Sequence, residues 1–244
     1  MDHRADLMRF YGILVALEAK VGGKRRLSGC SGRTGWPLRG VYFFFEPGEF
    51  RSGTGEGLRV VRVGTHALKA GSNRTLWKRL ANHRGTAGTG GGNHRGSVFR
   101  LLLGAAIKGR AGSQDPVSWA IGSSASEAAR ELGITTLEVK RGEHALEVAT
   151  SEYVRSMPFL WIGVRDAPGP GSDRGLLERN SIAMLSNCSR PPLDAPSERW
   201  LGFCCGRERV CESGLWNSNH VEDAYDPRFL DLLERYAGES GRHS

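Results

Sequence analysis

The chain has 244 residues, enough for one large domain with a sizeable hydrophobic core. Its 39% hydrophobic and 25% charged residues are typical of a globular protein rather than a membrane, collagen-like or disordered chain. With 34 Lys and Arg against 26 Asp and Glu, the formal net charge is +8, and Arg greatly outnumbers Lys. Because the planar guanidinium suits phosphate, this excess favours a polyanionic partner such as nucleic acid, although a coding bias towards Arg would give the same composition.

The start of the chain contains one short apolar run, FYGILVAL at residues 10–17, set among charged residues. The run is too short to cross a bilayer, and no small-residue cleavage site follows it, so we expect no membrane span and no membrane partner. It is better explained as part of an amphipathic helix over about residues 5–20 that docks on the core.

The cysteines form neither a disulfide framework nor a zinc-binding pattern. Five is an odd number, the spacing is irregular, and there is no C-x-x-C pair. Two adjacent cysteines rarely chelate one ion well, which disfavours a zinc site made by the last three cysteines and His220. We therefore expect reduced thiols and a cytoplasmic location. The cysteines are Cys30, Cys188, Cys204, Cys205 and Cys211.

Three segments have the composition of β-strands. Residues 40–46 are an aromatic run that ends at the turn signal Glu46-Pro47-Gly48, and residues 58–64 alternate apolar with basic side chains. The alternation predicts a strand with one packed and one solvated face. Residues 157–164, MPFLWIGV, are apolar throughout and predict a strand in the middle of the sheet.

Helical periodicity lies between and after these strands. We expect one helix over about residues 73–85, capped by Ser72 or Asn73, and another that begins after Ser172 or Asp173. The Gly-rich residues 84–94 have no phosphate-loop spacing and are expected to lack regular structure. Together with the strands, these helices indicate a mixed α/β (α+β) fold. Further helices are expected at about residues 97–108, 125–132, 143–155 and 226–236.

Two basic side chains stand out on the first of these helices. Arg79 and His83 are four residues apart on the flank of its apolar arc, so both can reach the edge of the sheet. On an isolated helix, the same two residues would simply belong to a solvated flank.

One carboxylate stands out on the later helix. Glu178 falls in the middle of an apolar face, where a carboxylate is costly unless a cation or a basic group such as Arg79 compensates it. A first turn that reaches solvent, where Glu also favours the helix dipole, explains the position equally well. The apolar face is formed by Leu177, Ile182, Met184 and Leu185.

The order of these features resembles the GIY-YIG nuclease superfamily. Gly40-Val41-Tyr42 matches the first motif and Arg62-Val63-Gly64 the second, before a helix with Arg and His and then a strand and a helix with Glu. The resemblance implies a small three-stranded antiparallel sheet flanked by helices, in a single domain over residues 1–244. Its core would be about residues 38–93 and 157–187, with a long helical insertion at 94–156 and a C-terminal extension at 188–244.

The resemblance also implies roles for individual residues. Tyr42 would be the catalytic phenol, Arg79 and His83 the basic pair of the helix, and Glu178 the metal ligand. Arg62 stands where the family has a second tyrosine. Because arginine cannot accept a proton, the general base would be Tyr42, His66 or His83.

The asparagine that the family carries after the glutamate has two candidate positions. Asn187 is nearest in sequence, and Asn217 lies in the polar, Trp-containing segment GLWNSNH, which we expect to pack against the site and which also offers His220. A DNA-binding surface is expected from a further group, although a plain solvated surface is as consistent with the sequence. This group comprises His66, Lys69, Asn73, His94 and Arg95.

These assignments imply an endonuclease that hydrolyses DNA, expected to be double-stranded, with one Mg²⁺ held by Glu178. Arg79, with Arg62, would stabilise charge on the phosphoryl oxygens, while Tyr42 takes a proton from water directly or through His83. A restriction or defence role fits an insertion that could read sequence, and a homodimer fits the cutting of both strands. The alternative is a catalytically inactive nucleic-acid-binding protein, suggested by the missing second tyrosine.

Overall fold

A computed structural model describes residues 2–240 of the chain. It has a mixed α/β fold built on an antiparallel sheet, with the strand order β1-β4-β2-β3. The three predicted strands are confirmed, and a two-residue strand is added at one edge, where Arg25 is paired with Phe159 and Arg26 with Pro158. The strands are β1 (Arg25–Arg26), β2 (Gly40–Phe50), β3 (Leu58–Gly64) and β4 (Pro158–Gly163).

Strand β2 is longer than its sequence predicted, because the turn signal at Glu46-Pro47-Gly48 does not end it. The β2–β3 register shifts between Phe45 and Phe50, so these residues form an irregular stretch of the ladder. Proline lacks an N–H and is tolerated at such irregularities.

The predicted helices are present, with different boundaries at three of them, and the last, α8, lies at Phe229–Glu239 rather than at about 226–236. Helix α2 begins at Leu76 rather than near residue 73, because Thr75 is the residue whose side chain accepts the Lys78 N–H, in place of Ser72 or Asn73. Helix α5 begins seven residues earlier than predicted, since Thr135 and Glu138 form a reciprocal capping box. The helices are α1 (His3–Val21), α2 (Leu76–Arg84), α3 (Val98–Arg110), α4 (Ala125–Leu132), α5 (Thr136–Ser156), α6 (Asp173–Leu185), α7 (Glu208–Ser213) and α8 (Phe229–Glu239), with short 3₁₀ turns η1 (Leu27–Gly29), η2 (His94–Gly96) and η3 (Leu201–Cys204).

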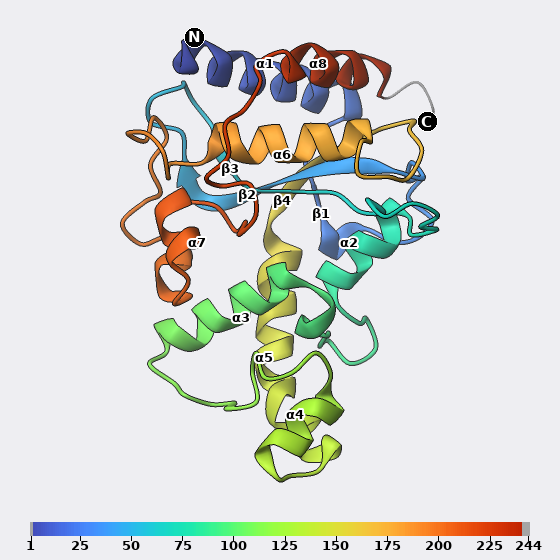
Figure 1. The fold of residues 1–244 in the computed structure, drawn as a ribbon, viewed down its shortest axis with the longest axis vertical. Helices are drawn as coiled ribbons and strands as arrows, with labels where there is room; N and C mark the ends of the chain where they lie inside the picture. Colours follow the sequence, from blue (N-terminus) through green and yellow to red (C-terminus); the bar gives the residue numbers. More distant parts are fainter. Residues whose placement is uncertain (1, 241–244) are drawn as a thin grey trace.

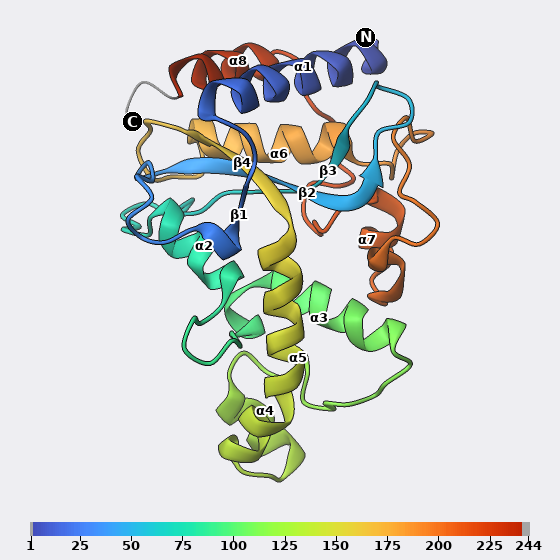
Figure 2. The ribbon, with the colours of Figure 1, turned by 180° about the vertical axis from the view of Figure 1, so that it is seen from behind.

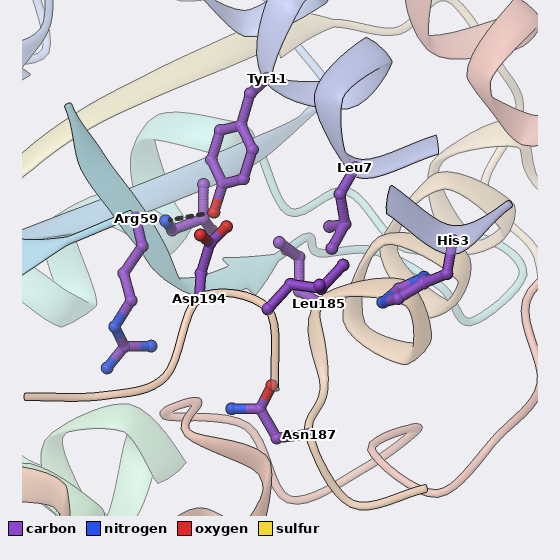
Figure 3. Close-up of a pocket in the computed structure, with 9 residues that line it drawn as sticks. His3, Leu7, Tyr11, Arg59, Leu185, Asn187 and Asp194 are labelled. Carbon is purple, nitrogen blue, oxygen red and sulfur yellow. Dashed lines mark hydrogen bonds between the residues drawn. The ribbon is translucent and has the colours of Figure 1, made fainter. Parts of the chain in front are cut away.

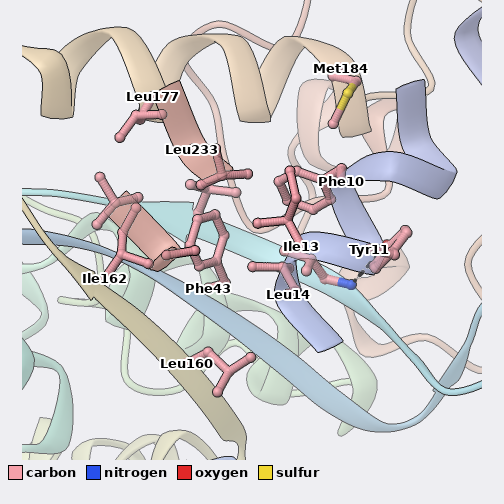
Figure 4. Packing of buried hydrophobic residues seen from close by; sticks show 14 of the residues in the cluster. Phe10, Tyr11, Ile13, Leu14, Phe43, Leu160, Ile162, Leu177, Met184 and Leu233 are labelled. Atoms are coloured by element: carbon pink, nitrogen blue, oxygen red, sulfur yellow. Dashed lines mark hydrogen bonds between the residues drawn. The ribbon is translucent and has the colours of Figure 1, made fainter. Parts of the chain in front are cut away.

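Helices cover both faces of the sheet (Figures 1 and 2). Along β2 the side chains alternate, so Phe43 and Phe45 point to one face while Tyr42 and Phe44 point to the other. Helices α1, α6 and α8 close the first face with an apolar core, in which Leu177 and Leu233 pack near Phe43 (Figure 4). The predicted docking of the N-terminal helix on the core is therefore confirmed.

The second face is covered by α2 and α3, together with the C-terminal residues around Trp216. Helix α5 runs away from the sheet and carries α4 at its far end, so this part of the insertion projects from the body in both views (Figures 1 and 2). None of the helices in residues 2–240 combines the length and apolarity that crossing a membrane would need.

Candidate active site

Five of the predicted side chains lie together where β3 ends. Tyr42 comes from β2 and Arg62 from β3, Arg79 and His83 come from α2, and Glu178 comes from α6 on the opposite face of the sheet. In the β2–β3 ladder Tyr42 is the direct partner of Gly64, the last residue of β3. The end of β3 is therefore the place where segments remote in sequence meet.

The glycine that ends β3 makes room for the phenol. A Cβ atom on Gly64 would lie 2.4 Å from the Tyr42 hydroxyl oxygen and 2.5 Å from its Cζ, far inside van der Waals contact. Any other residue at position 64 would push the Tyr42 ring out of its place. The glycine of the second motif thus serves the tyrosine of the first.

Tyr42 and His83 are fully buried and joined by a hydrogen bond. The Tyr42 hydroxyl lies 2.8 Å from His83 Nε2, and His83 Nδ1 lies 2.8 Å from the Ser97 hydroxyl. Burial lowers the pKa of His83 well below its usual value, and the charges of Arg79, Arg62 and Arg100 act in the same direction. His83 is therefore a neutral imidazole with a partner on each nitrogen.

Two guanidinium groups face the phenol oxygen. Attraction to Tyr42 is the main reason that the pKa of Arg79 is raised, and Arg79 also donates to the Gly96 carbonyl at 3.4 Å. Burial lowers the pKa of Arg62, while Tyr42 and Glu178 partly compensate its charge. Arg62 donates to the Trp216 carbonyl and lies 4.8 Å from the centre of the Phe99 ring. These contacts hold the Arg62 guanidinium beside Tyr42.

Glu178 reaches the same place from α6. Its Oε1 accepts the Thr65 N–H at 3.0 Å, just beyond the end of β3. Burial raises the pKa of Glu178, whereas Arg62 and the Thr65 N–H are the strongest influences in the other direction, with His220 and Arg79 following. A basic partner therefore compensates this carboxylate, and the first of them is Arg62 rather than Arg79.

A divalent cation fits this carboxylate only with help from the substrate. Among residues 2–240 no group of three or more His, Cys, Asp or Glu side chains is placed to hold a metal ion. Glu178 Oε2 accepts no hydrogen bond from the described residues, which leaves it available as a ligand. Mg²⁺ keeps several waters and is commonly held by one or two carboxylates together with substrate phosphate, so a single carboxylate beside a bound phosphate is an adequate donor set.

Of the expected DNA-binding residues, two are exposed and three are not. Lys69 and Asn73 lie exposed in the loop between β3 and α2. His66 is buried, and its pKa is lowered to about 4, first by burial and then by Arg174, while the Leu38 backbone acts in the opposite direction. His66 therefore lies beneath the surface as a neutral ring, and the expectation that it lines an exposed surface is wrong.

His94 and Arg95 also contradict the expected exposed surface, because both side chains are buried. His94 is buried, stacks on Trp119 with ring centres 3.8 Å apart, and lies 2.9 Å from Glu147 Oε1. Arg95 makes two hydrogen bonds of 2.7 Å to the Glu143 carboxylate, with only 6% of each side chain exposed. Both residues fasten the Gly-rich connection to α5, and neither belongs to a solvated surface.

The C-terminal extension packs against the site, as expected. The Trp216 N–H donates to the Val61 carbonyl at 2.7 Å, and the Asn217 amide accepts the Val63 N–H at 3.2 Å and donates to the Val63 carbonyl at 2.9 Å. Residues 215–217 thus cover the open edge of β3. Asn217 is beside the site, but its amide is engaged by the strand.

Asn187 lies elsewhere. It lines a small hollow with His3, Tyr11 and Asp194, beside Arg59 and Val60 at the start of β3 (Figure 3). None of the five clustered residues lines this hollow. Neither candidate asparagine is therefore brought to the site as a free side chain.

Two further residues lie near the site: Ser97, which carried little signal in the sequence, and His220, which the sequence offered as part of the segment GLWNSNH. Ser97 was predicted only as the start of a helix, yet it is buried against His83. His220, at φ 63°, lies close enough to Glu178 for its charge to lower the pKa of that carboxyl, and its Nδ1 is 2.7 Å from Asp223. Both contacts depend on how the insertion and the extension fold back, which local periodicity does not reveal.

Comparison with known proteins adds one result. The sequence model of the GIY-YIG domain family matches residues 1–242. No curated protein and no solved structure matches the chain.

Proposed function

Since the chain belongs to the GIY-YIG family, whose members act as nucleases, we propose that it is a metal-dependent endonuclease that hydrolyses DNA phosphodiester bonds. One observation carries the proposal: a phenol, two guanidinium groups, a neutral imidazole and a carboxylate surround the end of β3. A packed core gives no reason to gather these groups, because each of them is costly to bury.

In the proposed reaction, water attacks a phosphodiester in line with the leaving oxygen. Tyr42 accepts the proton of the water, and Arg79 stabilises the negative charge that develops on the phosphoryl oxygens. Glu178 would hold one Mg²⁺, which supplies Lewis-acid stabilisation when it is bound. His83 holds Tyr42 in place through the hydrogen bond of 2.8 Å.

Arg62 takes the position of the family's second tyrosine, and its chemistry differs. An arginine cannot exchange protons, so we assign it a purely electrostatic task beside Tyr42. Its contacts with the Trp216 carbonyl and the Phe99 ring keep the guanidinium in place before substrate arrives. A preorganised charge of this kind costs no rearrangement during the reaction.

The distribution of charge supports DNA as the substrate. Residues 19–45 and 57–114 contain no Asp or Glu, although the first stretch has six Lys and Arg and the second has eleven. These stretches include β3, α2 and most of β2. Arg59, Arg95 and Arg100 are paired with Glu49, Glu143 and Glu147, and the other cations of the two stretches leave a positive excess around the site. Residues 115–156, in contrast, have seven Asp and Glu against four Lys and Arg. We therefore propose that duplex DNA lies along α2 and not along the projecting α4–α5 arm.

The domain organisation and the cellular role are proposed as well. We propose one domain in which the core (38–93 and 157–187), the insertion (94–156) and the extension (188–244) fold together, since α3 and the extension both pack on Tyr42's face of the sheet. A cytoplasmic restriction or defence nuclease that acts as a homodimer is the role we favour, because one site per chain cuts one strand at a time.

The alternative is a nucleic-acid-binding protein without catalysis. Two observations favour it: Arg62 in place of tyrosine, and a Tyr42 side chain that is 0% exposed. Supercoiled plasmid incubated with Mg²⁺ decides between the two. Nicking or linearisation by wild type, lost in Glu178→Gln and kept in Glu131→Gln, whose carboxylate is exposed on α4, supports the nuclease. Tight DNA binding without cleavage across divalent metals supports the alternative.

A further inference from the structure

Ser97 lies at the end of a buried hydrogen-bonded chain that begins at Tyr42. The Tyr42 hydroxyl is 2.8 Å from His83 Nε2, and His83 Nδ1 is 2.8 Å from Ser97 Oγ. All three side chains are at most 1% exposed. Ser97 comes from the first residues of the insertion, so a residue outside the proposed nuclease core touches the proposed catalytic pair.

The hydrogen bonds of Ser97 determine which way its proton points. Ser97 caps α3, and its Oγ accepts the Arg100 N–H at 3.3 Å. The hydroxyl proton must therefore point elsewhere, and among the described residues the only other partner of Oγ is His83 Nδ1. A buried hydroxyl that fails to donate loses a hydrogen bond to water without replacement.

We infer that Ser97 donates to His83 Nδ1 and so fixes His83 as the tautomer that carries its proton on Nε2. A neutral imidazole has one N–H, so if Nδ1 accepts from Ser97, then Nε2 must donate to the Tyr42 oxygen. Ser97 is thus a positioning residue that acts on Tyr42 through His83.

This arrangement surrounds the phenol oxygen with donors. His83 Nε2–H points at it, and the guanidinium groups of Arg62 and Arg79 face it. Neither guanidinium can accept a proton, and in this tautomer Nε2 cannot accept one either. The three donors leave the Tyr42 oxygen as the acceptor of the site, the role that a general base needs.

The inference rests on the proposed function and sharpens it. Of the two proton routes, water to Tyr42 directly or water to Tyr42 and on to His83, it selects the direct one. His83 is then a donor to the Tyr42 oxygen and not a relay. The charged and titratable groups around His83 come from four elements. They are Tyr42 on β2, Arg62 on β3, Arg79 on α2, and Arg100 on α3, which donates to the His83 carbonyl at 2.9 Å.

Nitrogen-15 NMR of histidine-labelled protein tests the tautomer without any need for activity. We expect the His83 ring, assigned by its loss in His83→Gln, to show a protonated Nε2 and an unprotonated Nδ1. Ser97→Thr keeps both the hydroxyl and the cap and should leave this pattern unchanged. Ser97→Ala should give a mixture of the two tautomers. A wild-type ring protonated on Nδ1 overturns the inference.

The pH dependence of cleavage gives the second readout. In Ser97→Ala the acid limb of the rate profile should move to higher pH, with a rate about tenfold lower at neutral pH for a shift of one unit. Ser124→Ala is the matched control, since Ser124 caps α4 through the Glu127 N–H at 3.1 Å far from the site, and it should leave the profile unmoved. A rate lowered equally at every pH in Ser97→Ala would show a structural role only and overturn the inference. If wild type cleaves no DNA, the proposed function fails, while the NMR pattern still decides the tautomer.

Discussion

The two faces of the sheet differ in the side chains that they bury. Against α1, α6 and α8 the sheet presents phenylalanine, valine, leucine and isoleucine, and their neighbours are apolar as well (Figure 4). Against α2 and α3 it presents Phe44 and Val61 together with Tyr42 and Arg62, whose neighbours His83 and Ser97 are polar and also buried. Apolar packing tolerates exchanges of similar volume, whereas a buried polar group depends on its particular partner. The first face is therefore apolar throughout, whereas the second combines an apolar cluster with buried polar groups, which Glu178 of α6 joins at the end of β3.

The sharpest test of this difference uses two adjacent residues of α6. Glu178→Gln should lower cleavage by at least about 10²–10³-fold, because it removes the charge of the proposed metal ligand. Leu177→Ala should leave the rate per folded molecule unchanged but cost about 2–5 kcal/mol of unfolding free energy, since Leu177 is fully buried on the apolar face. Plasmid cleavage and urea denaturation measure the two effects. Equal losses of stability and of rate in both variants would contradict the distinction between a packing residue and a residue of the site.

Gly64 tests how much space the polar face leaves around Tyr42. Gly64→Ala should lower the cleavage rate about 10²-fold, because its Cβ would lie 2.4 Å from the Tyr42 oxygen and force the phenol aside. Gly12→Ala on α1 is the matched control, since its Cβ meets nothing within 4 Å and alanine favours a helix. Single-turnover cleavage of a labelled duplex measures both variants. Full activity in Gly64→Ala would show that the position of the ring is not critical.

Neighbouring aromatic residues of β2 extend the comparison. Tyr42→Phe removes only the hydroxyl and should lower the rate by about 10²–10⁴-fold, the usual contribution of a general base, and it should cost about 1–3 kcal/mol of stability because buried His83 loses its partner. Phe43→Ala points to the apolar face and should cost about 3–5 kcal/mol of stability. A Tyr42→Phe protein that cleaves at the wild-type rate would remove Tyr42 from the reaction.

The buried imidazole of His66 makes the polar face sensitive to pH. Its pKa is lowered to about 4 in the folded protein, against 6.5 for an ordinary histidine, so between these values the unfolded chain binds more protons. The unfolding free energy should therefore rise as the pH increases from about 4 to 6.5 and lose this contribution to its slope above that range. Denaturation at several pH values, with His66→Asn as the comparison, measures it. If the unfolding free energy of the variant depends on pH as strongly as that of wild type, groups other than His66 cause the dependence.

The smallest expected effect is on DNA binding and comes from an exposed lysine. Lys69 is exposed, so Lys69→Ala should weaken DNA binding modestly and reduce the salt dependence of the affinity by about one unit of slope. Lys140→Ala on the projecting α5 should change neither, if DNA lies along α2. Fluorescence anisotropy at several salt concentrations measures both. An equal loss of DNA affinity in Lys140→Ala and Lys69→Ala would show that DNA also contacts the projecting α4–α5 arm.

Local sequence patterns predicted most of the fold and part of the site. The strands at 40–46, 58–64 and 157–164 followed from apolar and alternating runs, and their order with the helices led to the family. Arg79, His83 and Glu178 stood out on their helices, but periodicity left a solvated flank or a solvated first turn equally open, and the family resemblance is what assigned them to the site. The same reasoning placed His94 and Arg95 on a surface, because it could not show that Glu147 and Glu143, about fifty residues later, would fold back to bind them.

The seam between the C-terminal extension and β3 limits how this protein can be shortened. Cutting the chain after residue 187 would remove the Trp216 carbonyl that anchors Arg62 and the Asn217 amide that closes the strand at Val63. The excised fragment would expose a row of unsatisfied peptide groups able to recruit a foreign strand. A fragment limited to the core that carries the two motifs would therefore expose the edge of β3 and lose the anchor of Arg62, whereas shortening the projecting α4 end would leave both contacts in place.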